Sequence, residues 1–140
     1  MKLATDMTEE FVKNSIIKFL SRNEWGTGLQ FGGLREHGVD IKVRHNRYPR
    51  YFQIECKGQG SKEVAFVYSL GQIVTRMETG GSTRNYFGLG LPDDSAEIAL
   101  RRLPWQVAKK LLLYVFSVTP NGEVTQYSWK DLKKKQESKK

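Results

Sequence analysis

Three charged residues suited to phosphate chemistry lie in one short stretch, residues 39–57, whose sequence predicts a β-hairpin. They are Asp40, Glu55 and Lys57. Alternate residues of a strand share a face, so Glu55 and Lys57 point the same way and Cys56 points to the opposite, apolar side. A turn centred near the middle of the stretch places Asp40 across the hairpin from the Glu55 region.

Two carboxylates that meet in this way repel each other unless a cation lies between them. The oxygen ligands of Asp40 and Glu55 suit Mg²⁺, with Mn²⁺ as a substitute, and the backbone carbonyl of Cys56 adds a third oxygen. Such an ion makes water nucleophilic and stabilises charge on a phosphodiester. Lys57 is expected to position the water and to offset phosphate charge. Adjacent carboxylates oppose the fall in its pKa that a general base would need.

Composition narrows the class of protein and its partners. The 140 residues carry a net charge of +8, which favours a polyanionic partner. The length predicts a single domain over residues 1–129, followed over residues 130–140 by a basic, partly disordered tail that is helical at first. The one cysteine excludes an internal disulfide and suits a cytoplasmic setting. No apolar run approaches the ~20 residues that cross a bilayer, so no membrane partner is expected.

The remaining segments predict an α/β fold in which helices pack against a mixed sheet. The first helix, residues 8–23, has Thr8 as its N-cap and buries a stripe that includes Val12 and Ile16. The glycines of the strand at 86–91 predict a closely packed helix above them. The other predicted elements are a short strand at 29–31, a helix at 62–78, a turn and N-cap at 92–95 followed by a short helix to about 103, a helix at 105–110, and strands at 111–118 and 124–129.

The pattern of Asp40 followed by Glu55-Cys56-Lys57 resembles the PD-(D/E)xK nuclease superfamily, which includes restriction endonucleases and archaeal Holliday-junction resolvases. Val39 stands where the name of the superfamily has proline. In these proteins a helix with a glutamate precedes the hairpin, as Glu9 does here, and a helix with a glutamine often follows it, as Gln72 does here. The similarity covers residues 8–118.

The resemblance implies a restriction-endonuclease-like αβββαβ core, here with an extra C-terminal hairpin. It also implies an Mg²⁺-dependent DNA endonuclease with Asp40 and Glu55 as metal ligands, Lys57 as the catalytic lysine, and Gln72 and Glu9 as auxiliaries. No separate reading domain is evident, so a structure-selective or nonspecific enzyme of the resolvase or repair type is expected rather than a sequence-specific one. Cutting both strands calls for a homodimer, for which residues 111–129 offer apolar surface.

Four arginines are candidates for DNA contacts, because phosphate contacts hold a nucleic acid without reading its sequence. Arg44, Arg47 and Arg50 surround the hairpin turn, and Arg76 follows Gln72 by one helical turn. A merely solvated turn explains the first three equally well. Two other functions remain open: a catalytically inactive nucleic-acid-binding module of the same fold, and a small basic RNA-binding protein unrelated to nucleases.

Overall fold

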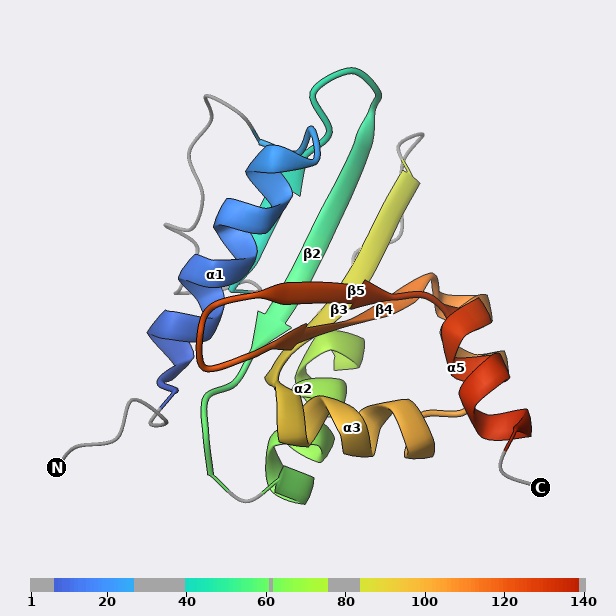
Figure 1. Ribbon diagram of the computed structural model, residues 1–140. Helices are drawn as coiled ribbons and strands as arrows, with labels where there is room; N and C mark the ends of the chain where they lie inside the picture. The colour runs from blue at the N-terminus through green and yellow to red at the C-terminus, as the bar shows by residue number, and fades with distance from the viewer. Residues whose placement is uncertain (1–6, 27–39, 61, 76–83, 139–140) are drawn as a thin grey trace, which may run out of the picture.

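The computed structural model describes residues 7–26, 40–60, 62–75 and 84–138. Its centre is a five-stranded mixed sheet with helices on both faces, as the sequence predicts for an α/β protein (Figure 1). The short strand predicted at residues 29–31 lies outside the described residues. The elements are α1 (Glu9–Arg22), β1 (Ile41–Arg44), β2 (Arg50–Cys56), α2 (Lys62–Thr75), β3 (Arg84–Pro92), α3 (Asp93–Arg102), α4 (Trp105–Leu111), β4 (Leu113–Val118), β5 (Val124–Tyr127) and α5 (Trp129–Glu137).

The sheet keeps the strands in chain order, β1-β2-β3-β4-β5. Its two outer pairs, β1–β2 and β4–β5, are antiparallel, whereas β2–β3 and β3–β4 are parallel and are joined through helices. In the first hairpin Ile41 pairs with Ile54 and Arg44 pairs with Tyr51. This register centres the turn between residues 47 and 48 and confirms the predicted hairpin.

Helix α1 begins and ends where the sequence predicts. The Thr8 hydroxyl accepts a hydrogen bond of 3.0 Å from the Phe11 amide, which satisfies one of the free donors of the first turn. Val12, Ile16 and Leu20 are fully buried against the sheet. They join a core on this face that includes residues of β1, β2 and β4, namely Ile41, Val43, Phe52, Ile54, Cys56, Phe116 and Val118.

The opposite face of the sheet is covered by α2, α3 and α5 (Figure 1). Phe66 and Ile73 of α2 are buried in this second core, as predicted, and Leu70 packs against it. Ala65 is also buried, although the sequence pattern assigns it to the neighbouring stripe. Across α2 and α3, Glu63 forms an ion pair with Arg102.

The helical start expected for the basic tail is present as α5 (Trp129–Glu137), and this helix packs on the rest of the fold. A capping box joins Ser128 and Asp131 at its start. Leu132 is fully buried in the second core. The Gln136 side-chain amide donates to the carbonyls of Leu100 and Leu103 at 3.0 and 2.7 Å. These contacts integrate α5 with α3, so no domain boundary is visible at residue 130.

Close approaches at glycines fix α1 on the sheet. A Cβ atom on Gly90 of β3 would lie 2.5 Å from Cδ1 of Ile16, which confirms the prediction of a helix packed over this strand. At Gly58, just after β2, a Cβ would lie 2.5 Å from the Glu9 nitrogen. The next residue, Gln59, donates its amide to the Met7 carbonyl at 2.7 Å and accepts from the Met7 amide at 3.0 Å. The start of α1 therefore rests directly on the segment that follows β2.

Within the described ranges, none of the helices is long and apolar enough to cross a membrane.

Gly58→Ala is expected to lower the free energy of unfolding by about 1–3 kcal/mol, because the added methyl would overlap backbone atoms. Backbone cannot rotate away as a flexible side chain can. The matched control is Gly60→Ala, since nothing lies within 4 Å of a Cβ at Gly60. Urea denaturation of the two variants measures the difference, and equal stability would contradict the close seating of α1.

Candidate active site

The two candidate carboxylates belong to residues at the open end of the first hairpin. The last ladder pair is Ile41 with Ile54, so Asp40 and Glu55 occupy the next facing positions. Oδ2 of Asp40 accepts a hydrogen bond of 2.8 Å from the Cys56 amide. This bond holds the Asp40 carboxylate at Cys56, the last residue of β2.

Glu55 is deeply buried for a charged residue. Its exposed fraction is 2%, and Oε1 is shielded from solvent. Ile54 and Cys56 belong to the core beneath α1, so by strand alternation Glu55 faces the α2 side of the sheet. Buried carboxylates require a compensating charge, hydrogen bonds or a metal ion, because desolvation of a carboxylate is costly.

Lys57 follows Glu55 on the same side of the sheet, as the strand spacing predicts. Its amide donates to the Gly90 carbonyl at 3.0 Å, so the backbone stays hydrogen-bonded to β3 beyond the end of β2. Its ammonium group lies 5.5 Å from the ring centroid of Tyr68 on α2. An ammonium over an aromatic face is attracted by the ring quadrupole, which holds Lys57 between β2 and α2.

Glu9, the first residue of α1, lies in the electrostatic field of the same cluster. Partial burial raises its pKa above the usual value, and the negative charge of Asp40 raises the pKa further. The positive charge of Lys57 acts on this pKa in the opposite direction. Helix α1 thus contributes a third carboxylate near the end of the hairpin.

The pKa of the Cys56 thiol provides a second indication that negative charges act on this region. Burial raises its pKa well above the usual value, and the charges of Asp40, Glu55 and Glu9 raise it further in that order. The charges of three acidic residues, one on α1, one just before β1 and one on β2, therefore all act on this thiol. Cys56 itself is buried and turned toward α1, away from Glu55.

Gln72 lies on α2, one turn beyond Tyr68. Its Oε1 atom is buried and has no hydrogen-bond partner among the described residues. A buried amide oxygen without a partner is costly, so this atom is available to a ligand or to water. No hydrogen bond in the described part of the chain joins this oxygen to Asp40, Glu55 or Lys57.

The donor set at the hairpin end consists of oxygen atoms. Among the described residues, no three His, Cys, Asp or Glu side chains come close enough to count as a metal-binding group. The candidates are therefore the carboxylates of Asp40 and Glu55 and the carbonyl of Cys56. This set matches Mg²⁺ chemistry, because Mg²⁺ is usually held by one or two carboxylates and keeps several waters.

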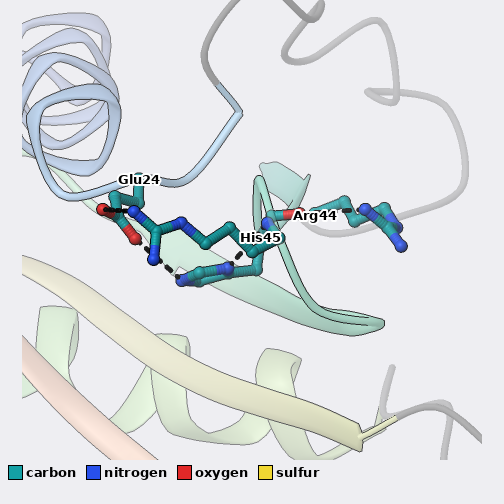
Figure 2. A network of polar contacts seen from close by, with 4 residues as sticks. Glu24, Arg44 and His45 are labelled. Carbon is teal, nitrogen blue, oxygen red and sulfur yellow. Dashed lines mark hydrogen bonds and ion pairs between the residues drawn. The ribbon is translucent and has the colours of Figure 1, made fainter.

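Part of the basic turn is engaged by an acidic residue at the end of α1. Arg47 contacts Glu24 at 3.2 Å, and Nε2 of His45 lies 3.8 Å from the same carboxylate (Figure 2). Arg44 donates to the His45 carbonyl at 3.0 Å. Glu24 offsets some of the positive charge that sequence reasoning assigned to this turn. The Arg47–Glu24 pair is exposed and therefore weak, worth about 0–1 kcal/mol.

Of the two remaining candidate arginines, the structure describes only Arg50. Arg50 stacks over the ring of Tyr48, with its guanidinium carbon 4.8 Å from the ring centroid. Both side chains are exposed at the tip of the hairpin. Arg76 lies outside the described residues. The tip thus holds Arg44, Arg47 and Arg50 at a distance from the carboxylates, at the opposite end of β2.

Sequence reasoning missed two residues that position the site. Tyr68 contacts Lys57, and its signal was its spacing of one helical turn from Gln72. Gly58 carries the start of α1 and hence Glu9, which follows from a close approach that no sequence pattern reveals.

Comparisons with family models, with curated proteins and with solved structures found no significant match to this chain.

The pKa of Glu9 is expected to change in opposite directions when its two charged neighbours are removed. Asp40→Asn should lower it toward the usual value, because a repelling negative charge is lost. Lys57→Met should raise it, because an attracting positive charge is lost. Carbon-detected NMR titration of the Glu9 carboxyl group in EDTA measures both shifts. Glu10→Gln removes a negative charge that raises this pKa less than Asp40 does, so it should lower the pKa by less than Asp40→Asn. A larger shift from Glu10→Gln, or shifts of the same sign from Asp40→Asn and Lys57→Met, would contradict the described electrostatics.

Proposed function

We propose that the protein is an Mg²⁺-dependent DNA endonuclease that hydrolyses phosphodiester bonds. The observation that supports the proposal is the backbone register, which brings Asp40, Glu55 and Lys57 to the same end of β2. Asp40 is held there by the Cys56 amide. A cluster of like charges has no packing advantage, since each buried carboxylate costs desolvation energy. A divalent cation removes that cost.

Asp40 and Glu55 are proposed to hold Mg²⁺ or Mn²⁺ with the carbonyl of Cys56. Bound there, the ion would supply Lewis-acid stabilisation of the phosphate and lower the pKa of a bound water. The hydrogen bond from Cys56 orients the Asp40 carboxylate before any ligand arrives, which is the role of outer-shell contacts in metal sites. The burial of Glu55 limits competition from bulk water.

Lys57 is proposed to orient the attacking water and to offset phosphate charge. Its ammonium group lies over the ring of Tyr68. Its positive charge also acts on the Glu9 carboxylate. Glu9 is proposed as an auxiliary carboxylate, since its charge interacts with those of Asp40 and Lys57. Gln72 is proposed as an auxiliary through its buried oxygen, which has no protein partner in the described residues.

The proposed core is of the restriction-endonuclease-like αβββαβ type. The order α1, β1, β2, α2, β3 supplies every element of this core except one strand, which the sequence predicts at residues 29–31, outside the described residues. The hairpin β4–β5 and its preceding helices are added toward the C-terminus. The proposed substrate is DNA, in keeping with the net charge of +8, and the proposed location is the cytoplasm. The described residues contain no separate domain for recognising a DNA sequence, which favours a structure-selective or nonspecific enzyme.

A homodimer is proposed for cleavage of both strands, but through a different surface from the one that the sequence suggested. Large hydrophobic side chains that are strongly exposed are found on α2 and not within residues 111–129, as far as the structure describes the chain. Those on α2 are Val64, Val67, Tyr68 and Val74, with exposed fractions of 44–63%. They repeat at helical spacing and form one stripe, which supports α2 as the contact between copies.

Plasmid, single-stranded and four-way-junction DNA should be cut in Mg²⁺ or Mn²⁺ and left intact in EDTA. Asp40→Asn and Lys57→Ala are each expected to lower the rate by at least about a hundredfold, because each removes several kcal/mol of charge stabilisation in the transition state. Gel analysis of initial rates measures the loss, and the ratio of linear to nicked plasmid reports paired cleavage.

Glu10→Gln is the matched control, since it removes an exposed carboxylate next to Glu9. It should cleave at the wild-type rate. Cleavage that persists in EDTA, or that survives both site substitutions, would contradict the proposal. Tight binding of all three DNAs with no cleavage in either metal would favour an inactive binding module of the same fold.

A further inference from the structure

A pair of stacked tryptophans lies where α4 and α5 meet. The rings of Trp105 and Trp129 are 5.7 Å apart between centroids and inclined by 27°. Each is the first residue of its helix. The Trp105 amide donates to Oε1 of Gln136 at 3.3 Å, which ties the start of α4 to the end of α5. The rings are therefore held by both helices and remain partly exposed.

Three lysines lie over these two rings. The ammonium groups of Lys109 and Lys130 are 4.7 and 5.8 Å from the Trp129 centroid. That of Lys133 is 5.0 Å from the Trp105 centroid. Together the two tryptophans and three lysines form the Trp–Lys surface. One surface thus combines several positive charges with two planar aromatic side chains.

Two acidic side chains of the neighbouring helices are engaged elsewhere. Glu97 of α3 contacts Arg101 at 3.7 Å and Lys135 at 3.2 Å. Asp131 of α5 accepts from the Ser128 amide at 2.8 Å as part of the helix cap. The positive charge of the Trp–Lys surface is consequently not neutralised by these carboxylates.

We propose that the Trp–Lys surface binds a single-stranded segment of nucleic acid. Proteins that hold single strands combine a positively charged track for phosphates with aromatic side chains on which bases stack. The lysines provide the first element and Trp105 and Trp129 the second. An acidic polypeptide would use the charge but has no planar base to stack on the rings, so a nucleic acid fits the surface better.

This surface is separate from the carboxylate cluster. Figure 1 shows α5 at the right edge of the molecule, across the sheet from α1 and beyond β3 and β4 from β2. The inference deepens the proposed function by naming where a strand flanking the cleavage point is held. It rests on that function for the expectation that the strand is DNA, whereas the binding itself needs no catalytic residue.

The test is the binding of a fluorescein-labelled oligodeoxythymidine to the full-length chain in EDTA, followed by anisotropy over a range of salt. Lys109→Gln combined with Lys133→Gln should weaken binding on the order of tenfold at 0.1 M salt and make the slope of log K against log salt shallower by roughly 1.4. The control removes the same charge from α1 through Lys18→Gln with Arg22→Gln. It should change the affinity by less than about twofold.

Intrinsic fluorescence supplies the second readout. In a Trp25→Phe background, titration with the oligonucleotide should quench Trp105 and Trp129, because stacked bases quench indole emission. Equal weakening by the control pair, no quenching, or equal competition by polyglutamate would each overturn the inference. Because binding is measured in EDTA, a protein that binds in this way but never cleaves contradicts only the endonuclease proposal. If the wild-type protein cleaves DNA, and the Lys109/Lys133 variant binds the oligonucleotide as well as the Lys18/Arg22 control does, only this inference is contradicted.

Discussion

The hydrogen bond from the Cys56 amide to the Asp40 carboxylate is the contact on which the proposed site depends. It joins the residue before β1 to the last residue of β2. The register of the hairpin places Asp40 opposite Glu55, and a slip of one residue would move the whole arm to the other face of the sheet. The hydrophobic residues on the α1 side prevent that slip, since Ile41, Ile54 and Cys56 would lose their core positions.

The site also depends on how α1 approaches the sheet. Gly58 and Gly90 leave room for the helix where side chains would block it. The first turn of α1 then lies next to the end of the hairpin, and Glu9 enters the field of Asp40 and Lys57. Two apolar cores, one on each face, thus support a charged cluster that would not form without them.

Much of this arrangement could be predicted from the sequence. Helix α1 was recognisable from Thr8 and its apolar stripe, and the hairpin from the apolar arms around a turn. The helical start of the basic tail was also predicted, but its packing on the rest of the fold was not, because its Lys-rich composition resembles an unattached tail. The decisive signals were a capping box at Ser128 and Asp131 and the single buried Leu132. The stacking of Trp105 on Trp129 joins separate helices and leaves no local pattern.

The central claim is that Asp40 and Glu55 share one divalent ion, and calorimetric titration with Mn²⁺ tests it most directly. The account predicts one ion per chain, bound at least about tenfold more weakly by Asp40→Asn and by Glu55→Gln, since even outer-shell changes cause such losses. The double substitution should lose less than the sum of the two, because both residues serve the same ion. Unchanged affinity in both single variants would contradict the account.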